Sequence, residues 1–447
     1  MAKAFRKILT KTLLVLLLLA AAVLLVRAVL NSTSGHRLTK YLETTKAEGL
    51  PLRVKDLVPA CPDSSNAAAQ WKAAEALFQV DRDDFPLMTK TITGFFQGGS
   101  IEAADRERLT ALTDKHRTLI NLMAEAGTRS CFRYGDWGLQ SYEVSQPKLV
   151  VMVQTIRLLA IDAVLRADRG EVPEALDQCL KGMRFIRLIA DEPLLINILV
   201  AIADMKVLIA AFNQIVQDRP IAPEVLTSWI AELDPLPWRA RFLRFLPGER
   251  ANMLESWLDI INGQTSIFNG SKKPGAFSRF YLWLIRPVLK AECLWLLKHW
   301  DGYTKMDTRS YWQTRDFLAQ KSLEAEHPPW PFKMVGTLLP ELHTVFYKEA
   351  MLEAMMLATR TGLAAKLYQA QTKRFPESLE ALVPGMFKEV PIDPFSGKPY
   401  VFKVQNGELL IYSLGSNLKD DGGRMTYMIF QLVMDKDDDW TWRERIK

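Results

Sequence analysis

Four titratable residues near the middle of the chain are its best candidates for chemistry: Asp204, Lys206, Glu249 and Glu255. Asp204 and Lys206 lie in an apolar segment, Leu194 to Val216, and perturbed pKa values in such surroundings often mark functional sites. Because these two residues are two positions apart, they do not face each other on a helix, and partners on other helices are expected. Glu249 and Glu255 could supply carboxylates for acid–base catalysis, although the sequence assigns a partner to neither.

Recognised catalytic motifs are absent from the sequence. It has no HExxH, GxSxG, Walker A or GxGxxG pattern, and its five histidines are scattered. Gly98-Gly99-Ser100 is too short to predict phosphate binding and is better explained as the entry to a helix. An enzyme with this sequence would need a site built from carboxylates dispersed over several helices.

Most of the net charge of +6 belongs to the N-terminus. Residues 1–30 contain five cations and no acidic residue: Lys3, Arg6, Lys7, Lys11 and Arg27. The rest of the chain is therefore nearly neutral, and its composition gives no argument for nucleic-acid binding.

An unbroken apolar run from Leu13 to Val26 predicts a membrane-spanning helix, and Ala28 to Leu30 extend the run past Arg27. A spanning helix needs about 20 residues, and the long Arg27 side chain can reach the headgroups from a position near the end of the span. Four cations precede Leu13, which predicts a cytoplasmic N-terminus. The expected location is the bacterial inner membrane, with a single span and with the bulk of the chain outside the cytoplasm.

The alternative is a cleaved signal peptide, because a short apolar run also fits one. No clean A-x-A site follows, but Ser32 and Ser34 are small enough for cleavage. Either interpretation places residues 31–447 outside the cytoplasm.

Cysteine spacing leaves two interpretations open. Cys61, Cys131, Cys179 and Cys293 are far apart and form no CxxC pair, so a zinc site is not expected. Four cysteines can form two disulfides in an oxidising compartment. Buried free thiols are the interpretation that we favour.

The sequence predicts a mainly α protein in four parts. Residues 1–30 form the anchor and 31–65 a connector that prolines interrupt. Residues 66–340 form an extracytoplasmic helical bundle, and 341–447 a small α+β domain with antiparallel strands.

Two segments of the bundle pattern as neighbouring helices. Leu149 to Arg169 and Pro173 to Ala190 are separated by Gly170 and predict an antiparallel hairpin. The pair resembles a tetratricopeptide hairpin, but Asp162 and Arg166 lie where that motif has large apolar residues, and no second copy follows. A plain hairpin within a larger bundle is favoured.

Two further segments raise the question of membrane contact. Leu194 to Val216 is apolar enough to span, but a charge near the centre of a span costs about 2.5–3.5 kcal/mol, which favours a buried bundle helix. Phe280 to Trp300 is rich in aromatic residues and carries Arg286 and Lys290, together with the preceding Arg279, on one helix face. A core helix with a solvated basic stripe is favoured there over an interfacial helix.

The region from Phe375 to Gly423 changes character. Prolines begin and end a short helix and then fix an extended loop. Pro399 to Val404 and Glu408 to Leu414 pattern as strands, joined by Asn406-Gly407, whose residues accept positive φ. A third strand is predicted at Met425 to Met434.

This order of elements resembles the C-terminal globular part of the major pseudopilins of type II secretion. There, a long helix leads through an aromatic–proline turn, a short helix and a proline-rich loop to a hairpin that ends in Tyr-Ser-Leu-Gly. The matching positions here are Phe375-Pro376, Leu379 to Pro384, Val390-Pro391, Asp393-Pro394-Phe395, Gly397, Pro399-Tyr400 and Tyr412-Ser413-Leu414-Gly415.

The resemblance covers about Ala350 to Gly423 and has clear departures. The helix before this head is internal and charged, and the N-terminus has no G-F-T-L-x-E processing signal. The chain therefore resembles an anchored helical protein with a pseudopilin-like head, not a processed pilus subunit. Its whole layout also resembles large families of uncharacterised single-anchor bacterial membrane proteins, which imply no activity.

Pseudopilins bind calcium in the loop after this motif, and the resemblance implies three ligands here: the Leu414 carbonyl, Asp420 and Asp421. Hard oxygen ligands on a glycine-rich turn suit calcium. The family's acids mostly follow its glycines, however, whereas Gly422-Gly423 here precede Arg424, and a solvated turn is the favoured explanation.

The leading hypothesis is a non-enzymatic membrane-anchored envelope protein whose role is assembly or scaffolding. Its expected partners are the lipid bilayer, through the N-terminal helix, and an envelope protein assembly. The alternatives are an enzyme with a site between helices and a calcium-stabilised binding module.

Overall fold

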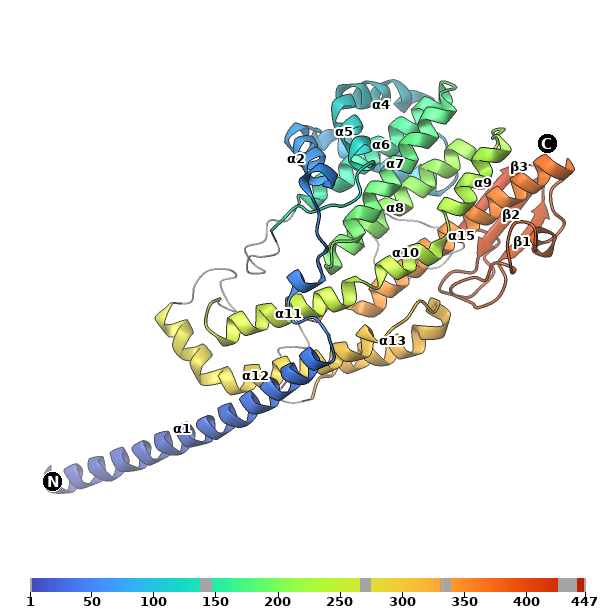
Figure 1. Ribbon diagram of the computed structural model, residues 1–447. Coiled ribbons are helices and arrows are strands. Elements are labelled where there is room, and N and C mark those ends of the chain that lie inside the picture. The colour runs from blue at the N-terminus through green and yellow to red at the C-terminus, as the bar shows by residue number, and fades with distance from the viewer. Residues whose placement is uncertain are drawn as a thin grey trace.

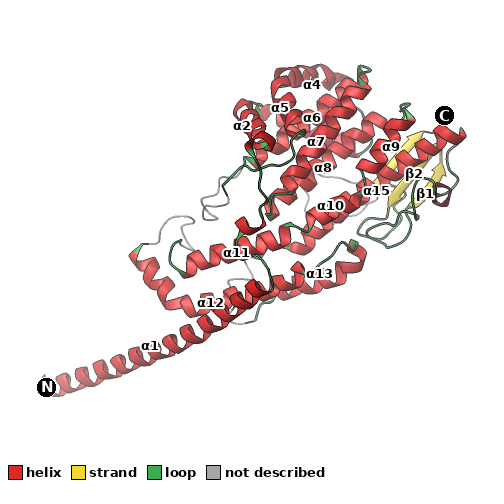
Figure 2. Cartoon of the chain, viewed as in Figure 1, coloured by secondary structure: helices red, strands yellow, loops and turns green. Residues whose placement is uncertain are grey.

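The chain forms a mainly helical body with a small antiparallel sheet at one end, which confirms the predicted secondary-structure content (Figures 1 and 2). The computed structural model describes residues 2–136, 147–265, 275–329, 332, 339–424 and 440–445. Figure 1 shows the N-terminal helix extending away from this body, with the sheet at the far end.

The helices, in chain order, are α1 (Ala2–Ala47), α2 (Ala68–Leu77), α3 (Phe85–Phe96), α4 (Ala103–Lys115), α5 (Arg117–Ala126), α6 (Leu149–Asp168), α7 (Val172–Ala190), α8 (Leu195–Val216), α9 (Pro223–Glu232), α10 (Pro235–Phe242), α11 (Phe245–Ile261), α12 (Ala276–Thr304), α13 (Tyr311–Glu326) and α15 (Leu342–Thr372). The strands are β1 (Val401–Gln405), β2 (Glu408–Ser413) and β3 (Trp440–Arg445).

Helix α1 does not end at the predicted anchor boundary but continues through much of the segment 31–65. No proline interrupts residues 31–47, and Leu38, Tyr41, Leu42 and Thr45 recur at helical spacing and turn toward the body. The helix ends before Gly49, which has a φ of 75°. Anchor and connector are thus one continuous helix, whose apolar part is long enough to span a membrane and is exposed throughout.

Helix α12 lies beside the second half of α1, and the two run in the same direction. Three contacts follow the same order in both helices: Arg27 with Trp283, Asn31 with Lys290, and Tyr41 with Asp301. Arg250 of α11 donates to the Tyr41 hydroxyl, 3.1 Å away, and so ties a third helix to this pair.

A proline inside α12 determines how the two helices meet. Pro287 has no N–H, so the carbonyl four residues earlier, that of Trp283, loses its helical donor. Arg27 supplies the missing donors, because its Nε and Nη2 lie 3.1 and 2.5 Å from this carbonyl oxygen. Figure 1 shows the bend: the first turns of α12 run toward α1, and the rest runs beside it.

The interpretation of α12 as a core helix with a solvated basic stripe holds for only part of it. Leu289, Cys293, Leu296 and Trp300, in the second half, are fully buried. Two of the three basic residues are engaged instead of freely solvated, since Arg286 donates to the Ile261 carbonyl and Lys290 to Asn31, whereas Arg279 is exposed. The first half exposes large aromatic side chains.

The predicted antiparallel hairpin is present as α6 and α7, which pack against each other and against α8. Its departures from the tetratricopeptide pattern have a structural reason. The buried Asp162 carboxylate accepts hydrogen bonds from Arg117, Arg166 and Gln178 at 2.5 to 3.0 Å. Polar residues stand here because all three donors converge on one oxygen of this carboxylate, Oδ2, and an apolar residue at position 162 would leave them without their acceptor. Most of α8 is likewise buried, as a bundle helix should be.

The sheet has the order β1-β2-β3, with both pairs antiparallel. The predicted hairpin is confirmed, with φ values of 52° at Asn406 and 76° at Gly407. The third strand predicted at Met425 to Met434 falls outside the described residues. The described third strand, β3, alternates buried and partly exposed residues from Trp440 onward, a period-2 pattern that sequence analysis missed.

Helix α15 joins the sheet to the bundle instead of marking a boundary between them. Trp442 of β3 lies flat over Gly362, where an added Cβ would be 2.2 Å from the indole ring. The buried Lys366 ammonium group reaches Glu444 of β3 at 2.6 Å and the carbonyl of Val216, at the end of α8, at 3.0 Å. The sheet is therefore held by the bundle's own helix.

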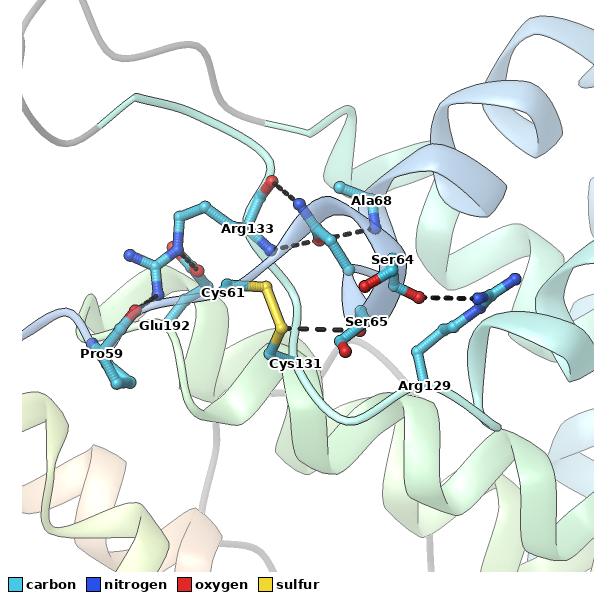
Figure 3. The surroundings of a disulfide bond; sticks show 10 residues. Pro59, Cys61, Ser64, Ser65, Ala68, Arg129, Cys131, Arg133 and Glu192 are labelled. Atoms are coloured by element: carbon cyan, nitrogen blue, oxygen red, sulfur yellow. Dashed lines mark hydrogen bonds and ion pairs between the residues drawn. A yellow bond between two sulfur atoms is a disulfide. The ribbon is translucent and has the colours of Figure 1, made fainter.

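A disulfide closes the segment that follows α1 onto the end of the α2–α5 region. Cys61 and Cys131 are bonded (Figure 3), whereas Cys179 and Cys293 are free and buried. The expectation of free thiols was thus wrong for one pair and holds for the other two. Asn66 and Arg133 support the bond, because the Asn66 amide donates to the Arg133 carbonyl and accepts from its N–H.

We expect alkylation of the denatured, unreduced protein to modify two of its four cysteines, and all four after reduction, as counted by mass spectrometry. Loss of the bond opens a 70-residue loop, so Cys61→Ser should lower the free energy of unfolding by about 4 kcal/mol. Cys131→Ser and the double variant should behave alike, because all three lack the same bond. Four reactive thiols without reductant would contradict the pairing.

Candidate functional site

The candidate pair Asp204 and Lys206 does not form one site. Asp204 is fully buried in α8, and neither of its oxygens accepts a hydrogen bond from a described residue. Burial raises the pKa of Asp204 to about 8, partly opposed by Arg157 of α6. Lys206 faces another way, with its ammonium group 5.9 Å from the Trp440 ring, and burial lowers its pKa to about 8. The expected partners on other helices are thus not found for Asp204 among the described residues, and the aromatic neighbour of Lys206 lies on a strand, β3.

Glu249 and Glu255 have structural partners. The Glu249 carboxylate accepts from the backbone N–H of Leu195, 3.0 Å away, and so caps the first turn of α8. Glu255 accepts from the Arg53 side chain at 2.8 Å and from the Val54 N–H at 3.3 Å. Both carboxylates thus hold helices α8 and α11 and the segment after α1 together.

A buried ionic cluster that was not predicted lies between α10 and α15. The Arg239 guanidinium lies 2.6 Å from Glu353 and 3.4 Å from Glu349, and Ser310 contributes a hydroxyl 3.5 Å from Glu353. Burial raises the pKa of Glu349 to about 8, an effect that Arg239 opposes and Glu353 reinforces. The four-residue spacing of two glutamates in a largely apolar helix was the available signal.

Cavities among the described residues include four of about 290 to 570 Å³. The largest of these four lies between α1 and α12 and is mostly apolar, with Arg37 and Lys298 among its lining residues. A second, of about 340 Å³, lies between α3, α8, α15 and β3. None of the four is lined by Asp204, Glu249, Glu255 or the Arg239 cluster, so these buried groups have no access to a ligand through them.

In the head, Asp393 organises the proline-rich loop that carries the pseudopilin resemblance. Its carboxylate accepts from the Ser396 and Ser413 hydroxyls, both at 2.7 Å, and from the N–H groups of Phe395 and Leu414. One side chain therefore links the loop to the end of β2. Its partners identify it as a structural residue.

Two of the three predicted calcium ligands, Asp420 and Asp421, already have other partners, and the third, Leu414, donates its N–H to Asp393. Asp420 accepts from the Lys403 ammonium group at 2.6 Å, the Tyr412 hydroxyl at 2.7 Å and the Gly422 N–H at 3.0 Å. Asp421 accepts from the Asn417 amide at 2.7 Å. No group of three or more His, Cys, Asp or Glu side chains suited to a metal occurs within the described ranges. Calcium would have to displace Lys403, so this arrangement does not fit the ion well.

Comparison of the chain with protein-family models, with curated proteins and with solved structures finds no match. The pseudopilin resemblance therefore stays a prediction that rests on the loop, the hairpin and their residues.

We predict that Asp204→Asn makes stability less dependent on pH. Because the pKa of Asp204 is raised in the folded state, protonation of this carboxyl stabilises the fold. This contribution to the free energy of unfolding is complete below the unfolded-state pKa of about 4 and is lost as the pH rises toward the folded-state pKa of about 8. The melting temperature of the wild type should fall between about pH 5 and pH 8, and the variant should fall less. The exposed Asp316→Asn is the matched control, and an equal fall in all three proteins would contradict the assignment.

For the head loop, we expect EDTA to leave the melting temperature of the full-length protein unchanged. Asp420→Ala should lower stability by about 1 kcal/mol with or without calcium, because it removes the contacts with Lys403 and Tyr412. A calcium-dependent rise in melting temperature that both Asp420→Ala and Asp421→Ala abolish would instead establish the predicted calcium site.

Proposed function

We propose that this protein is a non-enzymatic, membrane-anchored envelope protein that holds its helical body and pseudopilin-like head in a fixed orientation outside the cytoplasm, as part of a protein assembly. The observation that carries the proposal is the continuity of α1, which passes from its exposed apolar part into contact with α12 without a break. A flexible tether would let the body change its orientation relative to α1, whereas one continuous helix that is clamped to α12 does not.

The Cys61–Cys131 disulfide supports a location of the body outside the cytoplasm. Disulfides persist in oxidising compartments and are rare in the cytoplasm. The Cys61–Cys131 bond lies in the part of the chain that follows α1, where the cations before Leu13 and the retained anchor would place it outside the cytoplasm.

The architecture of the head supports an assembly role. The long α15 precedes a short 3₁₀ helix (Leu379–Leu382), the Asp393 loop and the β1–β2 hairpin, in the order that the resemblance implies. Val404 and Ile392 expose apolar side chains on this head. On a head that α15 holds in place, these exposed side chains are the contacts that we propose for another protein.

The enzyme hypothesis loses its candidates. Asp204 is sealed in the bundle, and Glu249 and Glu255 serve as a helix cap and an ion pair. The partners of Glu249 and Glu255 fit a structural role better than acid–base catalysis, and Asp204 lines none of the four cavities described above.

Purification of the tagged full-length protein from native membranes in mild detergent tests the proposal. We expect a protein partner at near-equal amounts by quantitative mass spectrometry, with much less of it bound to the head variant Val404→Ser. Leu236→Ser, at an exposed position on α10, should retain the partner and is the matched control. Recovery of the protein without partners, or catalytic turnover of a substrate, would overturn the proposal.

A further inference from the structure

The first half of α12 presents an apolar stripe to the outside. Phe277, Phe280, Tyr281, Leu284 and Val288 are exposed and recur every three or four residues, which places them on one face of the helix. Phe277 and Phe280 are 82% and 61% exposed. Such a stripe needs a covering, because large aromatic side chains are costly to leave in water.

This stripe points away from the body. Leu282 is buried against the body and lies two positions from both Phe280 and Leu284, so it occupies the opposite side of the helix. Figure 1 shows that the first half of α12 has the body on one side and the projecting part of α1 on the other. The stripe therefore faces in the direction in which α1 leaves the body.

The level of the stripe along α1 is fixed by Arg27. Its guanidinium stacks on the Trp283 ring, 3.6 Å from the centroid, and binds the Trp283 carbonyl. Arg27 directly follows the apolar run Leu13 to Val26, and the side chains of this run are exposed. The start of α12 thus lies where the unbroken apolar run of α1 ends. In membrane proteins, tryptophan and tyrosine are enriched at this level, the membrane–water interface.

Cations gather at the same level. Arg27, Arg286 and Lys290 lie close enough that the first two lower the pKa of Lys290, after burial, which is the larger cause. Arg279 is exposed one helical turn before Trp283. An aromatic stripe on one side and clustered cations on the other are typical of a helix lying at a bilayer surface, where the cations meet anionic headgroups.

We propose that the first half of α12 lies in the headgroup region of the bilayer that α1 spans, with Phe277, Phe280, Tyr281 and Leu284 inserted among the lipids. The occupant of the stripe is a phospholipid surface, because the stripe is continuous with the apolar surface of α1 and is flanked by cations. This inference rests on the proposed function only in requiring α1 to be a membrane anchor. It adds a second membrane contact, which prevents the body from turning about the axis of α1.

Spin-label accessibility in the full-length protein tests this contact. Phe280→Cys carries the nitroxide in vesicles of phosphatidylethanolamine and phosphatidylglycerol, and Leu236→Cys is the matched control, since Leu236 is 62% exposed on α10. Leu19→Cys, in the exposed apolar part of α1, reports on the anchor separately. Cys179 and Cys293 are buried, so unsubstituted protein gives the labelling background.

We expect the Phe280 label to collide more often with oxygen than with an aqueous nickel chelate, at a ratio between those of the Leu19 and Leu236 labels. Phe277→Cys should give the same result from the neighbouring turn. If the oxygen-to-nickel collision ratio of the Phe280 label equals that of the Leu236 label while the Leu19 label is in hydrocarbon, the lipid contact is wrong and the anchor stands. The same result is expected if a partner protein, absent from pure lipid vesicles, covers the stripe. An aqueous Leu19 label would overturn the anchor itself.

Discussion

The bond between Arg27 and the Trp283 carbonyl is the contact on which the arrangement of the anchor and the body depends. A proline in α12 creates the acceptor, and an arginine at the end of an apolar run supplies the donor. The guanidinium is planar and always charged, so it can stack on the indole ring and donate to the carbonyl at once, which a lysine does not do. The contact sets the register of the two helices, and the Asn31–Lys290 and Tyr41–Asp301 contacts follow from it in order. Burial and the bond to Asp301 raise the pKa of Tyr41 to about 12, so its hydroxyl keeps its proton as a donor.

Buried charge in the body is used for holding helices together. Asp162 gathers Arg117, Arg166 and Gln178, Arg239 joins Glu349 and Glu353, and Lys366 joins Glu444. Removing one partner of such a group leaves the other charge buried, which costs about 3–5 kcal/mol. The Arg239 and Lys366 clusters join elements that are far apart in the sequence, and the Asp162 cluster joins α5, α6 and α7. They therefore specify which helix faces which, where apolar packing alone would tolerate several arrangements.

Local patterns allowed much of the fold to be predicted. The apolar run, the α6–α7 hairpin, the burial of α8 and the Asn406-Gly407 turn each depend on residues close together in the sequence, and all are present. Strand β3 and the continuation of α1 were missed although their patterns are local, but most of the side-chain contacts that were missed depend on distant partners. Nothing near Arg27 shows that a carbonyl 256 residues away lacks a donor. Nothing near Cys61 names Cys131, and nothing near Asp420 shows that Lys403 neutralises it. The candidate carboxylates look alike in sequence, and only their partners distinguish a helix cap from an ion pair.

The Cys61–Cys131 bond gives the chain a covalent loop that contains the helices α2 to α5. A protease that cuts one peptide bond within this loop leaves the two pieces joined through sulfur. The nicked protein keeps its anchor, its body and its head in a single molecule. A cut of the same kind after Cys131 removes the covalent link between α1 and everything beyond the cut, so that packing alone holds the pieces together. Protection against the loss of α1 by a single cut is thus unevenly distributed along the chain and is confined to the loop that holds α2 to α5.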